Sequence, residues 1–458
     1  MKATLTELQA WVAGSHATGA VAFDGVVTDS RNATAGSLFV ALRGEHFDAH
    51  DFLGDVVAKG AAAVVAERVP DGFVVPALIV PDTRLALGEI ARHWRQRLVL
   101  PVIGVTGSNG KTTVKEMIAS ILNAAFGEGR FLATRGNLNN DIGVPLTVFR
   151  LAAEHRAAVI ELGMNHIGEI AYLASIAQPT LGLVNNAQRE HQEFMHSVQA
   201  VAEENGAVIC ALPENGIAVF PADDPFTSLW RDYAHENGKR HILTFGLSAD
   251  ADVTGEYVPN HSGSELTLFI QGRKIVLQLS AVGLHNVRNA LAAAACCHAI
   301  GIDANAIARG LEAFMPVNGR LQRKTAANGA AIIDDTYNAN PDSVLAAIDV
   351  LAQAPSPRIL VLGDMGEVGQ EGHRFHEEAG AYAKSCGIDH FYTMGQLARH
   401  AADAFGAAAV HADDVAALMQ SLNKTATPAA TVLVKGSRFM KMERVVHQLI
   451  NQEIREHG

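Results

Sequence analysis

Short apolar runs alternate with longer amphipathic segments along the chain, and this alternation predicts an α/β protein. In residues 1–97 the runs "SLFVAL", "AAAVVAE" and "PALIVPD" have the length of strands, and "LALGEIARHWRQR" has helical spacing. In residues 98–316, "AAVIELG" and "TLGLVNNA" are typical of buried parallel strands, and "KTTVKEMIASILNAAF" of a helix. Further along, "LTLFIQGRKIVLQL" predicts a hairpin that turns at residues 271–273.

A second set of strand-length runs begins after "FMPVNGR", which contains Pro and Gly. These runs are "AAIIDDTY", "RILVLGDMG", "HFYTMG" and "TVLVKGSR", and amphipathic segments between them are typical of a doubly wound unit. A chain of 458 residues is too long for one core. We therefore expect three domains at residues 1–97, 98–316 and 317–458. They are a small N-terminal α/β domain, a central parallel sheet and a C-terminal Rossmann-like doubly wound domain.

Composition excludes several classes of protein. The net charge of −12 argues against nucleic acid as a partner, because binding to a phosphate backbone requires clustered Lys and Arg. The N-terminal "MKATLTELQAW" has no apolar signal core, and the alanine-rich "ALAAAACCHAI" is too short for a membrane span. The four cysteines include no C-x-x-C pair, and Cys296 and Cys297 are expected to be buried thiols. We expect a cytoplasmic protein.

The stretch "VTGSNGKTTVKE" lies between a predicted strand and a predicted helix. A Gly-rich turn at such a place presents backbone N–H groups to a phosphate at the positive end of the helix dipole. The spelling departs from the usual G-x-x-x-x-G-K-[ST], because Val105 stands five residues before Gly110. Lys111 is placed to reach the terminal phosphates, and the Thr112 hydroxyl to hold Mg²⁺. The central domain is therefore predicted to resemble a P-loop ATPase.

Two residues after neighbouring strands are candidate ligands of that Mg²⁺. Glu161 ends "AAVIELG", and His191 follows "TLGLVNNA". Oxygen ligands beyond the loop are needed to hold a magnesium–nucleotide complex. A lone carboxylate or histidine is often structural, but the position of both beside the loop favours a site.

Other polar clusters also follow predicted strands. They are Asn137, Asn139 and Asn140 in "GNLNN"; Asp342 or Ser343, either able to cap the helix opened by "DDTYNANPDS"; Lys435 and Arg438 in "KGSRFMKME"; and Asp29, Ser30, Arg31 and Arg43 near the N-terminus. An Asn-rich turn or a solvated positive end would account for some of them without function. Glycines interleaved with Arg and Asp near the N-terminus indicate an anion or ring pocket.

Together these motifs resemble the Mur ligases, the ATP-dependent amide-bond-forming enzymes of peptidoglycan precursor synthesis. The resemblance spans the chain: "DSR…GSLFVALRG", "GVTGSNGKTTVKE", "GNLNNDIGVPLTV", "ELGMNHIGEI", "GLHNVRNALAA", "DDTYNANPDS", "LGDMGEVG" and "KGSR". "GNLNN", "DDTYNANP" and "KGSR" look like the members that add a dipeptide. The Asn-Pro-Arg motif of members that add diaminopimelate or lysine is not found in the sequence.

The resemblance implies a two-step reaction. A substrate carboxylate attacks the γ-phosphate of ATP, and the amine of the incoming dipeptide then attacks the resulting acyl phosphate. The implied substrates are UDP-N-acetylmuramoyl-tripeptide, D-alanyl-D-alanine and ATP, with Mg²⁺ as cofactor, and a monomer is expected. Catalysis of this kind consists mostly of positioning and charge neutralisation.

The resemblance also implies roles for individual residues. Lys111, Glu161 and His191 carry the catalysis, and Thr112, Glu161 and His191 serve the metal ions. The ATP-binding residues are Gly107, Ser108, Asn109, Gly110, Lys111, Thr112, Thr113, Asn286, Asn289, Arg320 and Asp335. The residues for the UDP-linked substrate are Ser30 and Arg31 at the uridine end and Asn137, Asn139 and Asn140 at the peptide end. Candidates for the dipeptide are Asn338, Asn340, Lys435 and Arg438.

One position departs from the family pattern. Mur ligases usually carry a lysine, carbamylated to hold a second metal ion, after the histidine motif. Asn205 stands near that place in "VAEENGAVI", and no lysine occurs between Lys115 and Lys239. We therefore expect Glu204, or else Glu203, to supply the missing carboxylate to the metal. The alternative is that both glutamates face solvent.

Two other functions remain open at this stage. One is a sister ligase, either another Mur enzyme or a folylpolyglutamate synthase-like protein; the "DSR…FVALRG" segment argues against the folate branch. The other is a nucleotide-dependent switch or motor, which leaves the asparagine clusters and the third domain unexplained.

Overall fold

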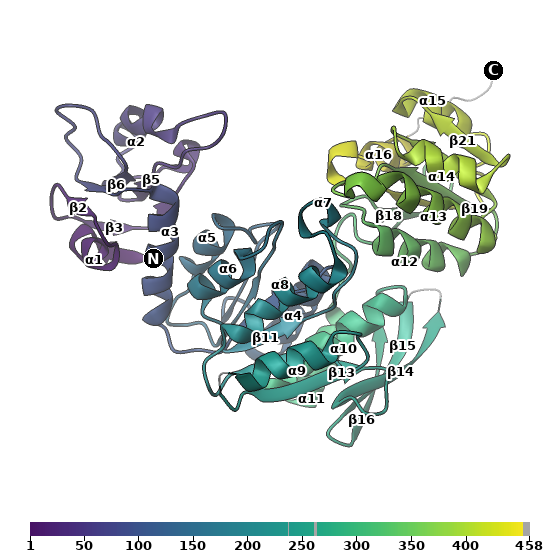
Figure 1. The fold of residues 1–458 in the computed structure, drawn as a ribbon, viewed down its shortest axis with the longest axis horizontal. Coiled ribbons are helices and arrows are strands. Elements are labelled where there is room, and N and C mark those ends of the chain that lie inside the picture. Colours follow the sequence, from purple (N-terminus) through teal and green to yellow (C-terminus); the bar gives the residue numbers. More distant parts are fainter. Residues whose placement is uncertain (237, 261–262, 452–458) are drawn as a thin grey trace.

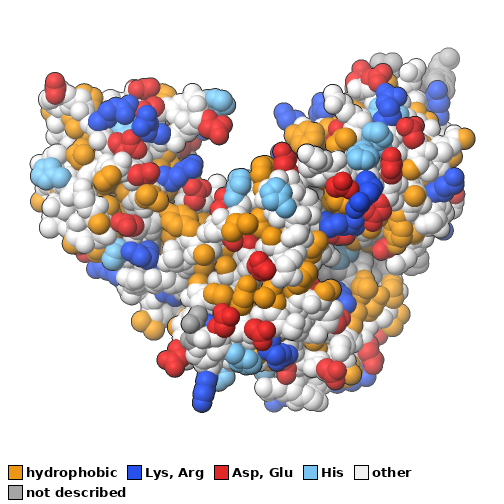
Figure 2. Space-filling view, in the orientation of Figure 1, with side chains coloured by type: hydrophobic (Ala, Val, Ile, Leu, Met, Phe, Trp, Pro, Cys, Tyr) orange, Lys and Arg blue, Asp and Glu red, His pale blue; other side chains and the backbone are white. Residues whose placement is uncertain are grey.

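The computed structural model describes residues 1–236, 238–260 and 263–451. Within them the chain forms three α/β parts, and no sheet is shared between two parts. Figure 1 shows the N-terminal and C-terminal parts on opposite sides of the central part, and Figure 2 shows a hollow between those two parts. None of the described helices is long and apolar enough to cross a membrane. The expected three-domain α/β architecture is confirmed.

The N-terminal part has two sheets. β1 pairs with β3, and a mixed five-stranded sheet has the order β2-β7-β6-β5-β4. Its elements are β1 (Lys2–Thr4), α1 (Leu5–Trp11), β2 (His16–Ala17), β3 (Ala22–Asp24), β4 (Val26–Val27), η1 (Ser30–Asn32), β5 (Leu38–Val40), η2 (Ala49–Phe52), α2 (Leu53–Ala58), β6 (Ala63–Ala66), β7 (Ala77–Ile79) and α3 (Thr83–Gln96). The predicted strands and helix of this region are therefore present.

Helix α3 joins the N-terminal part to the central part. Its buried face contributes Leu87 and Ile90 to a core that continues into the central sheet. The buried guanidinium of Arg95 donates to the Ala177 and Gln178 carbonyl oxygens at the end of α6 (Glu169–Ala177). A shared core and these hydrogen bonds stabilise the junction of the two parts.

The central part is built on a nine-stranded sheet with the order β16-β15-β14-β13-β12-β11-β8-β10-β9. Its elements are β8 (Val102–Thr106), α4 (Lys111–Phe126), β9 (Phe131–Ala133), α5 (Gly143–Val148), β10 (Ala157–Glu161), α6 (Glu169–Ala177), β11 (Leu181–Val184), α7 (Gln192–Met195), α8 (Val198–Cys210), β12 (Ile217–Pro221), α9 (Thr227–Glu236), β13 (His241–Gly246), β14 (Val253–Asn260), β15 (Gly263–Ile270), β16 (Arg273–Leu279), α10 (Leu284–Ala299) and α11 (Ala304–Ala313). The predicted hairpin forms β15 and β16.

The order of this sheet explains where a ligand binds. β8 lies between β10 and β11, so the chain leaves β8 on one side for β9 and β10 and on the other for β11. Open parallel sheets bind ligands at such a switch point, beyond the carboxyl ends of the strands. The Gly-rich loop, Glu161 and the segment leading to His191 follow β8, β10 and β11 in turn. The fold therefore gathers the predicted nucleotide-site residues at one edge.

The C-terminal part has a six-stranded sheet with the order β17-β18-β22-β19-β20-β21, parallel except for the edge strand β17. Its elements are β17 (Gln322–Thr325), β18 (Ala331–Asp335), α12 (Pro341–Ala352), β19 (Arg358–Gly363), η3 (Gly369–Glu371), α13 (Gly372–Ser385), β20 (His390–Met394), α14 (Ala398–Phe405), β21 (Ala409–Ala412), α15 (Val415–Leu422), β22 (Thr431–Lys435), η4 (Arg438–Met440) and α16 (Glu443–Ile450). This is the doubly wound unit that the apolar runs predicted.

The start of α12 corrects one prediction. The N-cap is Asn340 rather than Asp342 or Ser343. The Asn340 side chain accepts from the Ser343 N–H, and the Asn340 N–H donates to the Ser343 hydroxyl, which together form a capping box. Asp342 is engaged elsewhere, with Arg189 of the central part. Pro341 fits at the first helical position, where an N–H is not needed, so the cap moves one residue before it.

Candidate active site

The phosphate loop joins β8 to α4. Gly110 is the N-cap of α4 and has a left-handed backbone with φ of 83°. A Cβ atom at this position would lie 2.4 Å from Oδ1 of Asn289. Glycine is thus required twice over, by the backbone conformation and by the close approach of a buried amide.

Asparagine side chains hydrogen-bond to the backbone of the phosphate loop. The Gly107 N–H donates to Oδ1 of Asn205 at 2.7 Å, and the Asn109 N–H donates to Oδ1 of Asn186 at 2.9 Å. The Ser108 N–H donates to the Asn186 carbonyl oxygen. Three N–H groups of the predicted cradle are therefore bonded to protein in this structure. The first turn of α4, whose N–H groups have no acceptor within the helix, is the part best placed to receive phosphate.

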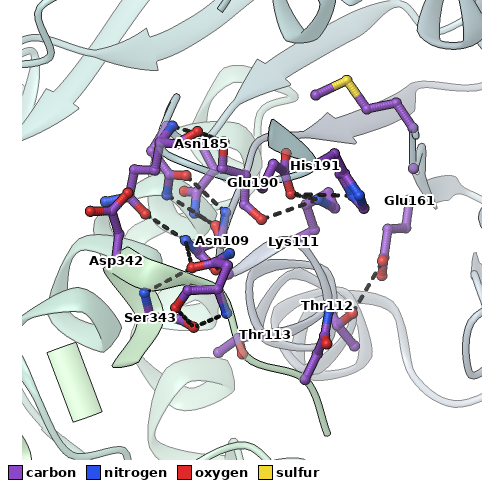
Figure 3. A pocket seen from close by; sticks show the side chains of 18 of the residues that line it. Asn109, Lys111, Thr112, Thr113, Glu161, Asn185, Glu190, His191, Asp342 and Ser343 are labelled. Atoms are coloured by element: carbon purple, nitrogen blue, oxygen red, sulfur yellow. Dashed lines mark hydrogen bonds and ion pairs between the residues drawn. The ribbon is translucent and has the colours of Figure 1, made fainter. Parts of the chain in front are cut away.

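Lys111 folds back onto its own loop. Its Nζ lies 2.5 Å from the Gly107 carbonyl oxygen, 3.2 Å from that of Ser108 and 3.3 Å from Oε2 of Glu190. Figure 3 shows the Lys111 and Glu190 side chains pointing toward each other beside His191. Glu190 was not predicted from the sequence, because a lone glutamate in a polar loop carries no signal of burial. Its side chain is only 6% exposed.

Glu161 lies on the other side of the start of α4 (Figure 3). Its Oε1 accepts from the Thr112 hydroxyl at 3.1 Å and from Nδ2 of Asn139 at 2.8 Å. Arg320, from the loop that enters the C-terminal part, donates to the same Thr112 hydroxyl at 2.9 Å. Four predicted residues from distant segments therefore form one hydrogen-bonded cluster.

The donors present fit a divalent cation. Oε2 of Glu161 and Oε1 of Glu190 are buried and have no hydrogen-bond partner among the described residues. Buried carboxylate oxygens without a donor are costly unless a cation or donor meets them. The described residues contain no ready-made group of three metal-binding His, Cys, Asp or Glu side chains. Magnesium is commonly held by one or two carboxylates together with substrate phosphates, which suits this arrangement.

His191 has a left-handed backbone with φ of 48° at the start of α7. Its Nδ1 forms an ion-pair contact with Oε2 of Glu367 in the C-terminal part at 2.5 Å, and this contact lowers the pKa of Glu367. Its Nε2 lies 3.8 Å from Oε2 of Glu190. The histidine is thereby oriented by one carboxylate while its other nitrogen is next to a second carboxylate.

The structure gives Glu204 a task other than the expected metal site. Both of its carboxylate oxygens accept backbone N–H groups at the start of α6, from Gly168 and Ile170. A carboxylate at a helix N-terminus is stabilised by these donors and by the helix dipole. Glu203 accepts from the side chain of Gln199 on the exposed face of α8. Neither glutamate lines the cavity of the site, so the expected replacement of the family lysine by Glu204 was wrong in this structure.

A chain of amides lies at the start of α10. Nδ2 of Asn289 donates to Oδ1 of Asn286, and Nδ2 of Asn185 donates to Oδ1 of Asn289. Asn286 and Asn289 are buried. Asn185 also donates to the Asn109 carbonyl oxygen, so the amides connect α10 to the phosphate loop. Asn286 and Asn289, which were predicted to bind ATP, thus lie next to the phosphate loop.

The C-terminal part contributes polar groups across the boundary. Nδ2 of Asn340 donates to Oδ1 of Asn109 at 2.9 Å. Lys435 is buried and bonds both Oδ2 of Asp335, at 2.5 Å, and the Asn338 carbonyl oxygen. Arg438 behaves differently: its side chain is 67% exposed and pairs with Glu443. Lys435 and Arg438 therefore do not form a joint clamp.

Arg189 joins the central part to two carboxylates of the C-terminal part. Its guanidinium donates to Oδ1 of Asp342 at 2.7 and 3.0 Å and to both oxygens of Glu378. Its backbone N–H also donates to Asp342. Burial alone would lower the pKa of Arg189, but the two carboxylates raise it. Bidentate pairs of this kind define orientation as well as adding energy.

These groups surround one cavity of about 1010 Å³. It is lined by the predicted residues Ser108, Asn109, Gly110, Lys111, Thr112, Thr113, Asn137, Asn139, Asn140, Glu161, His191, Asn286, Asn289, Arg320, Asp335, Asn338, Asn340 and Lys435. Gly107, Ser30, Arg31, Glu204 and Arg438 do not line it. In the N-terminal part, Arg31 instead holds Asp29 and lowers the pKa of that carboxyl to about 2.

Family models match three segments of the chain. They are the Mur ligase family catalytic domain at residues 22–95, the Mur ligase middle domain at residues 105–297 and the Mur ligase glutamate ligase domain at residues 319–438. Each segment falls in one of the three structural parts. The fold and the site together define an ATP-dependent ligase.

Individual relatives match nearly the whole chain. The UDP-N-acetylmuramoyl-tripeptide–D-alanyl-D-alanine ligase of Escherichia coli (strain K12) is 42% identical over 97% of this chain and 98% of its own length. The ligase of the same name from Bacillus subtilis (strain 168) is 34% identical over 94% of each chain. A crystal structure of MurF from Acinetobacter baumannii has a TM-score of 0.91 at 34% identity and 99% coverage of both chains. The chain belongs to the Mur ligase family.

Proposed function

We propose that this chain joins D-alanyl-D-alanine to UDP-N-acetylmuramoyl-tripeptide, with conversion of ATP to ADP and phosphate. The observation that carries the proposal is the cavity, in which the phosphate loop, the 137–140 asparagines and Asn338 and Asn340 of the C-terminal part meet. Relatives bearing this activity in their names match more than nine-tenths of the chain. A MurF ligase from Thermotoga maritima solved with ADP, 27% identical with a TM-score of 0.82, supports nucleotide use.

The reaction needs charge neutralisation at the phosphates and alignment of two nucleophiles. A carboxylate oxygen of the tripeptide attacks the γ-phosphorus, and ADP leaves. The dipeptide amine then attacks the acyl carbon, loses a proton, and inorganic phosphate leaves as the amide forms. Lys111 and the first turn of α4 are positioned to neutralise the β- and γ-phosphates. Arg320, held over the ring of Tyr337 at 4.1 Å, adds a second cation at Thr112.

Mg²⁺ is the cofactor that fits the orphaned carboxylate oxygens of the site. Thr112, Glu161 and His191 would serve the magnesium ions, as expected from the sequence. A bound magnesium ion would neutralise charge that develops on the transferring phosphate. Asn139 anchors Glu161 and borders the place where the tripeptide carboxylate has to arrive.

The two ends of the bound substrates are assigned to different parts. Residues 1–97, with Ser30 and Arg31, would receive the uridine nucleotide, and residues 98–316 would bind ATP. Residues 317–458 would receive D-alanyl-D-alanine through Asn338 and Asn340, while Lys435 supports Asn338 and Asp335 from behind. Because Ser30 and Arg31 lie outside the cavity, a long substrate that spans from the N-terminal part to the loop fits this division.

The proposal includes the cellular setting. ATP and UDP-linked precursors are metabolites of the cytoplasm, and we propose that the chain works there as a monomer. Size-exclusion chromatography with light scattering tests the monomer, and a dimer at working concentrations would contradict it.

The activity is tested by phosphate release from ATP. Purified chain is mixed with UDP-N-acetylmuramoyl-tripeptide carrying diaminopimelate or lysine, and D-alanyl-D-alanine is compared with D-alanine, L-lysine and diaminopimelate. Release that depends on the dipeptide, with a pentapeptide product seen by mass spectrometry, is expected. Equal phosphate release without the dipeptide would sink the proposal.

Lys111→Ala should abolish this turnover while the fold survives. Loss of a charge aimed at the transferring phosphate lowers the rate by about 10²–10³-fold or more. The exposed Lys239→Ala serves as matched control and should retain wild-type rates. Thermal unfolding of both variants checks the fold, and wild-type turnover in Lys111→Ala would refute the loop assignment.

A further inference from the structure

Glu190 is a buried carboxylate whose two oxygens have different surroundings. Oε2 lies 3.3 Å from Nζ of Lys111 and 3.8 Å from Nε2 of His191. Oε1 is buried and has no hydrogen-bond partner among the described residues. An ionised carboxylate in such a place needs a cation beside it. In this structure Lys111 is that cation.

Lys111 has to leave Glu190 when a nucleotide binds. Its ammonium group is here turned toward the Gly107 and Ser108 carbonyl oxygens, behind the loop, rather than toward the first turn of α4. The lysine of a phosphate loop contacts the terminal phosphates of the bound nucleotide. Once Lys111 turns to a phosphate, Glu190 loses its counter-ion while new negative charge arrives nearby. A second cation is then required at Glu190.

The groups around Glu190 favour a divalent metal ion as this second cation. Nε2 of His191 is the next polar atom to Oε2, and Nδ1 of the same ring is held by Glu367. Glu204, which was expected to serve the metal ion, instead accepts the Gly168 and Ile170 N–H groups at the start of α6. Phosphate oxygens of the nucleotide would complete the shell, because magnesium binds through few carboxylates plus phosphate.

We propose that Glu190 is a metal-binding residue of the nucleotide site. It pairs with Lys111 in the empty site and exchanges that lysine for a divalent cation, shared with His191, when the phosphates of ATP bind. The inference rests on the proposed function in that ATP is the ligand. It adds a residue to the metal site and an order of events to nucleotide binding.

The metal half is tested with Mn²⁺ as a paramagnetic substitute for Mg²⁺. Free Mn²⁺ is measured by electron paramagnetic resonance during titration of the full chain with a non-hydrolysable ATP analogue present. Glu190→Gln should bind one ion about tenfold or more weakly than wild type, because a full charge is removed from the ion's shell. Glu190→Asp, which keeps the charge, should fall between them. Glu193→Gln, which removes an exposed charge three residues away, should match wild type.

The proposed exchange of Lys111 for a metal ion predicts that Glu190→Gln has opposite effects on nucleotide affinity without and with metal. Without metal, in EDTA, Glu190→Gln should bind ADP on the order of threefold more tightly than wild type, because Lys111 no longer has to break an ion pair. With Mn²⁺ the same variant should bind the nucleotide more weakly. Isothermal titration calorimetry measures both affinities, and far-UV circular dichroism checks the fold.

Two results would overturn the inference. One is wild-type Mn²⁺ affinity in Glu190→Gln with nucleotide present. The other is a loss of ADP affinity of equal size with and without metal, which would mark a merely structural role. If wild-type protein instead fails to release phosphate in a dipeptide-dependent way, the proposed function fails and the metal result stands independently.

Discussion

Asn205 stands near the position of the family's metal-binding lysine and supports the phosphate loop instead. Its Oδ1 accepts the Gly107 N–H at 2.7 Å, and its backbone carbonyl oxygen accepts from the Thr106 hydroxyl. The side chain is buried on α8. At the place where the family pattern has a lysine, this chain therefore has a support for the phosphate loop. Under our proposal, the negative charge beside the metal ion comes instead from Glu190, which pairs with Lys111 in this structure.

Asn205→Ala should weaken nucleotide binding without preventing folding. The Gly107 N–H would be left buried without an acceptor, at a cost of about 1–3 kcal/mol, and the loop would lose its anchor. We expect about tenfold weaker ADP binding by calorimetry. Gln199→Ala, on the exposed face of the same helix, is the control. Unchanged ADP affinity in Asn205→Ala would show that the loop keeps its shape without this bond.

At the scale of elements, α12 links the stability of the C-terminal part to the geometry of the site. Asn340 caps the helix with its Oδ1 and reaches Asn109 of the phosphate loop with its Nδ2. One side chain thus serves a local and a tertiary purpose. The two purposes are separable, because a hydroxyl can cap a helix but cannot span to Asn109.

Two substitutions at Asn340 should show its effect on stability separately from its effect on activity. Asn340→Ala loses the cap, which costs about 0.5–2 kcal/mol, and should lower both the melting temperature and kcat/KM. Asn340→Ser keeps a capping oxygen and should regain the melting temperature while kcat/KM stays low. Differential scanning fluorimetry and the phosphate-release assay measure the two. Full activity in Asn340→Ser would mean that the bond to Asn109 is dispensable.

Helix α13 contains a buried histidine that makes the C-terminal part sensitive to acid. Nε2 of His376 accepts the Met365 N–H at 3.0 Å, and its Nδ1–H donates to the Gly372 carbonyl oxygen. The ring is fully buried, and burial lowers its pKa although the bond to Gly372 opposes this. The folded chain therefore holds the neutral ring at pH values where an exposed histidine is protonated.

Acidification below about pH 6.5, the ordinary histidine pKa, should destabilise this part. There the unfolded chain takes up a proton that folded His376 does not bind, so the free energy of unfolding falls as the pH falls. Above that pH both states are neutral and no change is expected. The melting temperature of His376→Gln should fall less steeply than that of wild type between pH 7 and 5. The exposed His373→Gln is the control, and equal slopes for all three would contradict the assignment.

At the scale of the whole molecule, the site exists only while the central and C-terminal parts keep their relative orientation. Arg189 joins them through Asp342 and Glu378, and His191 joins them through Glu367. The N-terminal part is joined to the central part differently, because α3 shares a continuous apolar core with the central sheet. The junction between the central and C-terminal parts is held by polar contacts, and the junction at α3 by an apolar core. We therefore expect domain movement at the junction between the central and C-terminal parts.

Charge reversal tests the polar junction. Arg189→Glu should repel Asp342, increase the radius of gyration in small-angle X-ray scattering and lower kcat/KM about tenfold, or about 1.4 kcal/mol. The double variant Arg189→Glu/Asp342→Arg should recover part of both. Lys239→Glu makes the same charge change on an exposed side chain and should change neither the radius of gyration nor kcat/KM. Compact scattering in Arg189→Glu would show that the junction does not depend on this pair.

The α/β class, the order of elements and the residues at the ends of strands could be predicted from the amino-acid sequence alone. Apolar periodicity and the glycine spelling of the loop are local properties, and local properties are readable from the chain. In "AAVIELG" and "TVLVKGSR", for example, the apolar residues alone predict a strand that ends in polar residues. The two strands form as β10 and β22, and Glu161 and Lys435 lie at their carboxyl ends as expected.

Which side chains contact one another depends on tertiary packing and could not be predicted from the sequence. Glu190, Asn205 and Arg189 carry no motif, and their tasks arise from burial and from partners far along the chain. Glu204 and Asp342 had the right chemistry for their expected tasks, but N–H groups of α6 and the guanidinium of Arg189 lay closer to them. A carboxylate binds whichever donor the fold brings within hydrogen-bond distance. That distance is set by packing between elements, which no local pattern encodes.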